Sequence, residues 1–339
     1  MTQDLSTLEI VEVRADDPAA VDEAFQVGNE AMLADYPEFP PNCRYDHDQW
    51  LVTPMPGTAR HTFLGRRDGE PVGTAVVDLP LWDNLDKAMF DVSVVPVARR
   101  RGVGQALYVH AAAFARDQGR RSALGFSTFH VEGFAHALGL ESKLTDVRRR
   151  LDLSTVDDAL LDRLYAEGLA RAAGYSVVRW GDRTPDELLA DVAALDSSFI
   201  GEAPLGELDY EPEQLDADRI RQKDEVRSKH GRRTYNTGVL HDASGRLVAW
   251  SAIRMQKTVD WHAWQQITLV SPEHRGHRLG VVSKIENLRY IREAAPSLRV
   301  IDTFNAEVNV HMIAINEAMG FQVRERWANW QGPIDGSVA

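Results

Sequence analysis

Hydrophobic and polar positions in the first half of the chain alternate at two different spacings. A period of two predicts strands over residues 8–14, 61–66, 71–79 and 90–95. A helical period predicts helices over 19–33 and 103–116, the second with one apolar stripe at positions 103, 106, 107, 111 and 114. Asp68-Gly69 between two of the strands favours a hairpin turn, because glycine accepts the positive φ that such a turn requires.

The second half repeats this order of elements. Strands are predicted over residues 235–240, 247–255, 265–270 and 300–304, and a helix over 279–293. Four landmarks recur 176 residues further along the chain: Gly69, Pro96, Arg99 and Gly104 match Gly245, Pro272, Arg275 and Gly280. Because the register is held over this distance, duplication of one unit explains the pattern better than chance.

Strands and helices alternating in each copy predict a mixed α/β, α+β-like fold with two domains of one design. We expect the first domain to span residues 1–155 and the second to span 175–339. The intervening segment 156–174 has helical composition, so a packed connecting helix is expected there rather than a flexible linker. A length of 339 residues lets each domain bury its own core.

Composition narrows the functional classes. The formal net charge of −13 argues against nucleic-acid binding, which needs clustered positive charge. It either favours a cationic or amine-bearing small substrate or serves solubility alone. The single cysteine, Cys43, excludes an internal disulfide, and the 11 histidines show no metal-ligand spacing, so no metal is expected. No apolar run is long enough for a membrane helix and the first residues lack a signal-peptide pattern, so a cytoplasmic protein is expected.

The most informative segment joins the strand that ends at Val95 to the helix that begins at Val103. The intervening loop contains three arginines, Arg99–Arg101, and ends at Gly102. The first amides of a helix have no intrahelical partner and lie at the positive end of the helix dipole, so this junction suits a phosphate or pyrophosphate. It has neither P-loop nor dinucleotide-fingerprint spacing. A tight turn with solvated arginines is the alternative, but recurrence in the second copy favours a binding site.

These residues resemble a known motif. Arg99-x-x-Gly102-x-Gly104 after Val94-x-Pro96 looks like the acetyl-CoA-binding motif of the GNAT superfamily of N-acetyltransferases. Because the resemblance covers both halves, the chain looks like a tandem GNAT, similar in plan to the mycothiol synthases. In each half, the resemblance implies a mostly antiparallel mixed sheet with one splayed parallel strand pair and flanking helices.

The resemblance also implies an activity, the transfer of an acetyl group from acetyl-CoA to a small-molecule amine. The coenzyme pyrophosphate would bind the loop amides, and the pantetheine would lie along the strand before the loop. The residues so assigned to acetyl-CoA in the first copy are Val94, Val95, Arg99, Arg100, Arg101, Gly102, Val103 and Gly104. In the second copy they are Leu269, Val270, Arg275, Gly276, His277, Arg278, Leu279, Gly280, Asn309 and Asn316.

Each copy departs from the family pattern at a different place. The second copy has Arg278 where the first has Gly102, and that side chain would either obstruct the pyrophosphate or bind it. The family's later motif runs from an Asn through a Tyr to Gly-Phe. The second copy keeps Asn309 but has Asn316 in place of the Tyr, whereas the first copy has Thr128 and Ala135 at the two positions. The sequence therefore leaves open which copy is active.

Acetylation needs a group that takes a proton from the amine. Asp91 is a candidate base, because strand alternation places it with Ser93 and Val95 on one face. In the second copy, Glu307 and His311 flank Asn309 and are the other candidates. A cluster after residue 128 is a weaker alternative, consisting of His130, Glu132 and His136.

Two polar segments complete the predictions. Residues 202–229 are expected to form a solvated helix and loop that lies over the second half as a possible lid, and Arg148–Arg150 are expected to be surface charge.

The competing functional hypotheses are a non-catalytic tandem protein, in which any coenzyme A contact is structural or regulatory, and an interaction scaffold. The sequence leaves the oligomeric state open between monomer and homodimer.

Overall fold

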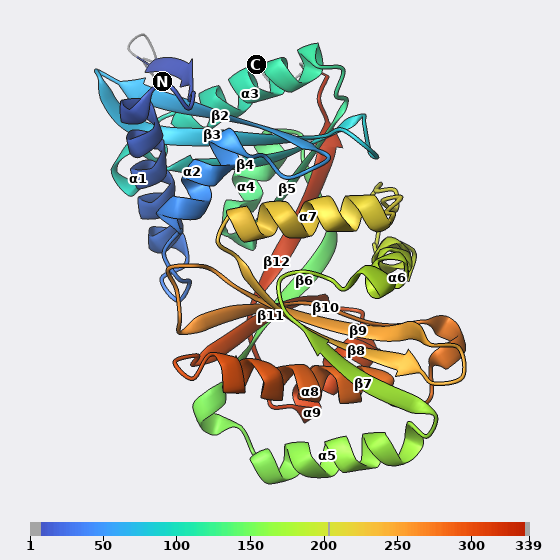
Figure 1. Ribbon diagram of the computed structural model, residues 1–339. Coiled ribbons are helices and arrows are strands. Elements are labelled where there is room, and N and C mark those ends of the chain that lie inside the picture. Colours follow the sequence, from blue (N-terminus) through green and yellow to red (C-terminus); the bar gives the residue numbers. More distant parts are fainter. Residues whose placement is uncertain (1–7, 203, 336–339) are drawn as a thin grey trace. The chain divides into compact units, whose positions relative to one another are not determined.

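The computed structural model describes residues 8–202 and 204–335 (Figure 1). The first residues, on which the expected absence of a signal peptide depends, lie outside the described residues. The chain divides into two compact units. The N-terminal unit comprises Met1–Thr145, Gly206–Asp209 and Trp327–Ala339, and the C-terminal unit comprises Asp146–Leu205 and Tyr210–Arg326.

The N-terminal unit contains one mixed sheet with helices on both faces. Its strands lie in the order β1-β2-β3-β4-β5-β12, and every neighbouring pair is antiparallel except β4 and β5. The strands are β1 (Leu8–Glu12), β2 (Thr58–Arg67), β3 (Glu70–Pro80), β4 (Lys87–Val94), β5 (Ser122–Thr128) and the end of β12 (Gln322–Pro333). The helices are α1 (Pro18–Asp35), α2 (Arg44–Val52), α3 (Val103–Asp117) and α4 (Glu132–Ala137).

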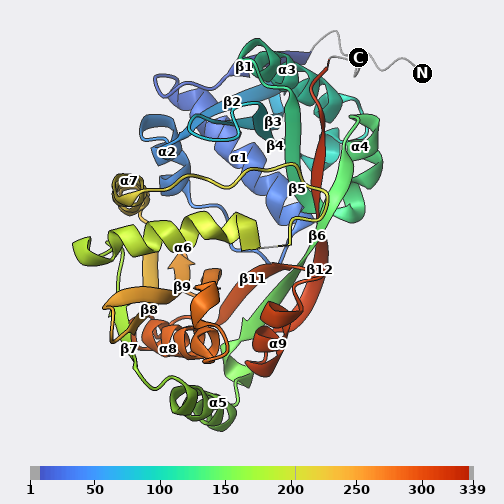
Figure 2. The ribbon, with the colours of Figure 1, turned by 90° about the vertical axis from the view of Figure 1, so that its right-hand side faces the viewer.

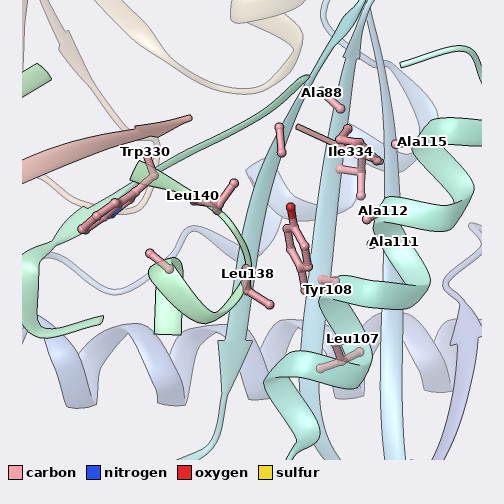
Figure 3. Packing of buried hydrophobic residues seen from close by; sticks show 14 of the residues in the cluster. Ala88, Leu107, Tyr108, Ala111, Ala112, Ala115, Leu138, Leu140, Trp330 and Ile334 are labelled. Atoms are coloured by element: carbon pink, nitrogen blue, oxygen red, sulfur yellow. The ribbon is translucent and has the colours of Figure 1, made fainter. Parts of the chain in front are cut away.

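Helix α3 covers one face of this sheet with the apolar stripe predicted from its sequence. Leu107, Ala111 and Ala115 of α3 are fully buried (Figure 3). They pack with strand side chains such as Phe63 of β2. The next residue of β2, Leu64, points to the opposite face and packs against α1. Alternation along the strands thus builds a core on each side of the sheet, which is what the two-residue period predicts.

The C-terminal unit has the same plan. Its strands lie in the order β6-β11-β10-β9-β8-β7, with β10 and β11 parallel and the other pairs antiparallel. The strands are the end of β6 (Glu141–Asp152), β7 (Tyr175–Trp180), β8 (Arg233–His241), β9 (Arg246–Met255), β10 (His262–Val270) and β11 (Val300–Ala306). The helices are α5 (Asp158–Arg171), α6 (Leu189–Glu202), α7 (Ala217–Lys229), α8 (Leu279–Ala294) and α9 (Val310–Ala318). The predicted mixed α/β fold is confirmed.

The last strand of each sequence copy pairs within the other unit. Residues 146–152 of β6 come from the first copy and pair antiparallel with β11. Residues 327–333 of β12 end the second copy and pair antiparallel with β5 (Figure 2). The sequence repeat and the compact units therefore do not share their boundaries.

The expectation that Arg148–Arg150 are surface charge is wrong. The three side chains are 2%, 4% and 8% exposed. Arg148 and Arg150 donate to the buried carboxylate of Asp302 at 2.9 and 2.7 Å. Burial alone would raise the pKa of Asp302, but hydrogen bonds from Arg150 and His262 and the charges of the arginines lower it to about 2. Arg148 and Arg150 are thus neutralised by a partner that is distant in sequence.

Two further segments differ from their predictions. The stretch from Pro37 to Pro56, whose prolines predict a loop, contains α2, because residues 42–53 include no proline to interrupt a helix. The segment predicted as solvated contains α7, whose Ile220 is 2% exposed and packs against α6 residues. Helix α7 therefore has one buried face and one solvated face.

Candidate functional site

The parallel strands β4 and β5 of the N-terminal unit diverge along their length. They pair from Lys87 and Ser122 to Phe90 and Gly125. Beyond that point β4 continues beside β3 as far as Val94, whereas β5 continues beside β12. The edge of β4 that leads into the basic loop is therefore separated from β5, and this splay is what the family resemblance implies.

The loop after β4 has an exposed backbone with two left-handed residues. Arg100 has φ 60° and Gly102 has φ 79°, and α3 begins at the next residue. The Arg99 side chain does not face outward, because it donates to the Val94 carbonyl at 2.8 Å and to Asp35 at 2.7 Å. Arg99 thus ties the loop to α1, while Arg100 and Arg101 are exposed beside the first amides of α3, whose unpaired donors suit an anion.

The equivalent loop of the C-terminal unit has the same two left-handed positions, but its glycine stands at the first of them and not at the second. Gly276 has φ 86° and Arg278 has φ 57°, at the places of Arg100 and Gly102. The sequence departure at Arg278 therefore preserves the left-handed conformation. Strands β10 and β11 also diverge, since they pair only from His262 to Trp264.

Helix α5 approaches the loop of the C-terminal unit. The His277 ring Nδ1 lies 3.2 Å from the Arg171 carbonyl oxygen, in the last turn of α5. Arg278 Nη1 lies 3.8 Å from a carboxylate oxygen of Glu167. The negative end of the α5 dipole and the Glu167 carboxylate therefore lie at this loop, and both oppose anion binding there.

Asp91 lies on β4 directly after the last residue paired with β5. Its side chain is accessible to solvent, yet the surrounding unit desolvates it enough to raise its pKa, an effect that Arg60 and Ser93 partly oppose. Arg60 itself donates to Asp78 at 2.7 Å and lies over the Trp50 ring at 3.5 Å. A carboxylate with a raised pKa at the splay is chemically suited to exchange a proton with an amine.

Tyr36 reaches the same place from the end of α1 and was missed by the sequence analysis. Its phenol hydrogen-bonds Thr128, the last residue of β5. Burial raises the pKa of Tyr36, hydrogen bonds with Thr128 lower it in part, and the charges of Asp35 and Asp91 raise it further. Its ring stacks on Trp327 at 4.7 Å. The end of α1, the end of β5 and β12 therefore meet here. In the sequence, the aromatic residues next to Pro37 were the only sign of this cluster.

The weaker candidates of the N-terminal unit lie around this group. The His130 ring contacts the Thr128 hydroxyl, and its Nε2 lies 3.9 Å from Asp35. His136 packs edge-on against Trp330. Glu132 begins α4.

The candidates of the C-terminal unit do not converge in the same way. Glu307 pairs with Arg326 at 2.5 Å on the surface, and His311 is exposed on α9. The Asn309 side chain caps α9 by accepting from the Met312 amide at 3.2 Å. The position equivalent to Asp91 is Ile267, which is 9% exposed and packs with α6 residues.

Asn316 stands at the position of the missing family tyrosine and belongs to a buried polar network. Asn316 is fully buried, accepts a hydrogen bond from Lys284 Nζ and donates to Asn305 Oδ1 at 2.5 Å. This network crosses the interior of the C-terminal unit from α8 to β11. Asn316 therefore binds neighbouring side chains in this structure.

Two classes of site are not found within residues 8–202 and 204–335. Those residues include no group of three or more His, Cys, Asp or Glu side chains arranged to hold a metal ion. None of the helices in the described part of the chain is long and apolar enough to cross a membrane.

Comparison with known proteins defines the class. Residues 26–138 match the acetyltransferase (GNAT) family. A solved tandem GNAT protein from the clavulanic acid biosynthesis pathway is 31% identical, with 96% of this chain and 98% of that chain covered and a TM-score of 0.80. A GCN5-related N-acetyltransferase from Sphaerobacter thermophilus shares the fold at 15% identity, 96% coverage of each chain and a TM-score of 0.63. The search of curated proteins gave no match.

The chain therefore belongs to the GNAT acetyltransferase family. It has two splayed strand pairs, β4–β5 and β10–β11, and in each pair a basic loop and a helix follow the first strand. The clavulanic acid pathway protein is likewise a tandem GNAT protein. As a member of this family it is an acyltransferase.

Proposed function

We propose that the protein is an acetyl-CoA-dependent N-acetyltransferase of small-molecule amines and that its N-terminal unit carries the reaction. The observation that carries this proposal is the position of Asp91 at the splay of β4 and β5, in the unit whose loop is free of α5. The family match over residues 26–138 falls within the same sequence copy.

The residues of the N-terminal unit fit acetyl-CoA. Gly102 and the first amides of α3 offer donors to the pyrophosphate, and the edge of β4 at Val94 and Val95 offers backbone groups to the pantetheine. A Cβ at Gly104 would make only ordinary van der Waals contacts, 3.4 Å from the Phe134 ring and 3.5 Å from Val94, so packing within the unit does not by itself require glycine there. When bound, acetyl-CoA supplies an activated acetyl thioester.

The side chains at the splay supply the proton chemistry. An alkylammonium must lose a proton before it attacks, and the raised pKa of Asp91 makes its carboxylate a better acceptor for that proton. Tyr36 has a raised pKa, so its phenol stays protonated at neutral pH and is a hydrogen-bond donor beside Thr128. A backbone amide of β4 near the loop is placed to donate to a developing oxyanion.

The C-terminal unit is proposed to have a supporting or binding role. Ile267 stands where Asp91 stands in the other unit, so the equivalent carboxylate is lost. Glu307 and His311 remain predicted candidates for a base there, but both lie on exposed surfaces of the unit.

Calorimetry with acetyl-CoA tests the assignment of the units. Gly102→Glu should abolish acetyl-CoA binding. The new carboxylate would lie at the first amides of α3, where the pyrophosphate of acetyl-CoA is expected, and would repel it. Arg278→Glu makes the matched change in the other unit, because Arg278 stands at the place of Gly102, and it should leave binding intact. Loss of binding in Arg278→Glu alone would assign the site to the C-terminal unit instead. Coenzyme A release across a panel of amines then measures catalysis, and silence with every amine would favour a non-catalytic protein.

A further inference from the structure

The C-terminal unit contains a cavity of about 470 Å³. Its walls come from three segments of this unit, which are α6, the turn that leads into β9 and the short turn Pro272–His274 after β10. The apolar part of the lining consists of Leu195, Leu247 and Val248, all of which are buried. A cavity of this size accommodates a small organic molecule.

The first copy fills the equivalent space with hydrophobic side chains. In the N-terminal unit, Val27 of α1 packs against Val95 and Ala98, and all three are buried. The register of 176 residues puts Ser271 and His274 at the places of Val95 and Ala98. The second copy has thus replaced an apolar contact between helix and loop by an open space with polar walls.

Helix α6 leaves this space open as well. The side chains that it contributes to the cavity include the small Ala194 and Ser198. Unfilled space costs packing energy, and a cavity with polar walls is normally occupied by water or by a ligand. The divergence of the two copies at this place therefore points to a ligand of the second copy.

The cavity carries one carboxylate whose charge is not balanced. Asp191 is 5% exposed, and its oxygens accept from Arg246 at 2.5 Å and from the Leu247 amide at 2.8 Å, so the protein itself neutralises it. Glu273 also lines the cavity, but it makes no hydrogen bond or ion pair with residues 8–202 or 204–335. An ammonium group of a ligand would supply the missing partner, and the net charge of −13 favours the approach of a cation.

The remaining polar groups of the cavity suit hydroxyls. The Ser271 hydroxyl has no hydrogen-bond partner within the described ranges. His274 Nδ1 lies 2.9 Å from the Tyr175 hydroxyl, so a ligand can meet the other ring nitrogen. Ser198 donates to the Leu195 carbonyl at 2.7 Å, which leaves its oxygen as an acceptor. A hydroxyl both donates and accepts, so it matches each of these groups.

We propose that this cavity binds a small amine that carries several hydroxyl groups, with the ammonium at Glu273 and hydroxyls at Ser198, Ser271 and His274. The residues of this unit that the family resemblance assigns to acetyl-CoA are not among those that line the cavity in the described part of the chain. The site is therefore separate from the coenzyme loop, and it gives the second copy a binding function of its own.

Titration calorimetry of the whole chain at neutral pH, without acetyl-CoA, tests the site. Glucosamine is the probe, glucose is the neutral control and glucuronate is the anionic control. Glucosamine should bind saturably, and both controls should bind at least tenfold more weakly, because only the amine carries the charge that complements Glu273. Absence of glucosamine binding, equal binding of glucose or tighter binding of glucuronate would overturn the proposal.

Two variants localise the binding, and a third is the matched control. Glu273→Gln should weaken glucosamine binding at least tenfold. Ser271→Val should also weaken it, because valine, the residue of the first copy, fills part of the cavity and removes a hydroxyl. Glu317→Gln makes the same change as Glu273→Gln at an exposed position of α9 and should leave binding unchanged.

The proposal also fails if Glu273→Gln binds glucosamine as the wild type does, or if Glu317→Gln loses as much affinity. Thermal unfolding shows whether each variant is folded. All residues that line the cavity belong to the C-terminal unit, so coenzyme A release by the N-terminal unit does not depend on either outcome.

Discussion

Lys284 on α8 provides a quantitative test of the buried polar network. The side chain is 1% exposed, and its Nζ donates to Asn316 and lies 5.0 Å from the centre of the Phe321 ring. Both partners favour the charged form, but neither carries a negative charge. Desolvation therefore dominates and lowers the pKa of Lys284 from 10.5 to about 7.

The sign of the effect on stability follows from the number of protons bound in each state. Below about pH 7 both states hold the proton, and between the folded pKa of about 7 and the unfolded value of 10.5 only the unfolded state does. The free energy of unfolding should therefore rise with pH across this window. At about 1.4 kcal/mol per pKa unit, the full rise is about 5 kcal/mol, of which about 2 kcal/mol falls between pH 7 and about pH 9.

Urea unfolding of the wild type and of Lys284→Met at the two pH values measures this contribution. Methionine removes the titrating group and keeps most of the volume, and the hydrogen bond lost by Asn316 costs the same at both pH values. As the pH rises over this range, the free energy of unfolding should increase by about 2 kcal/mol more in the wild type than in Lys284→Met. Lys229→Met, at an exposed position of α7, corrects for the loss of a surface lysine. Parallel pH dependence of wild type and Lys284→Met would refute the reasoning.

Three further predictions follow from single residues. Asp91→Asn should lower kcat/KM by about 10²–10⁴-fold with unchanged acetyl-CoA affinity, and wild-type activity should fall as the pH drops through the raised pKa of Asp91, measured by coenzyme A release. Asp302→Asn should cost about 3–5 kcal/mol in urea unfolding. At about 1.4 kcal/mol per pKa unit, the lowered pKa of Asp302 accounts for about 2 kcal/mol of this, which the wild type should lose as the pH falls from about 4 towards about 2. Gly28→Ala should raise the free energy of unfolding by about 0.5–1 kcal/mol because a Cβ there meets nothing within 4 Å, whereas Gly238→Ala should lower it because its Cβ would overlap Leu247. Equal effects of the two alanines would contradict the packing argument.

Much of the fold was predictable because its signals are local. The stripe of α3, the hairpin turn at Asp68-Gly69 and the basic loop ending at Gly102 each depend on residues close together in the chain. The position of Asp91 on the face away from α3 followed from alternation along one strand. The held register between the copies predicted two units of one plan, and the family resemblance came from the same residues.

The tertiary structure alone decided which distant segments meet. Arg148–Arg150 form a charged run in the sequence, but β6 pairs with β11 and brings Arg148 and Arg150 to Asp302, which makes burial possible. Tyr36 reaches Thr128 only through the packing of α1 against the sheet. The sequence by itself determined most of the elements, the duplication and the basic loop before α3, because short-range periodicity and helix ends encode them. The exchange of final strands and the meeting of Tyr36 with Thr128 at the splay depend on contacts between residues far apart in sequence, whose partners no local pattern specifies.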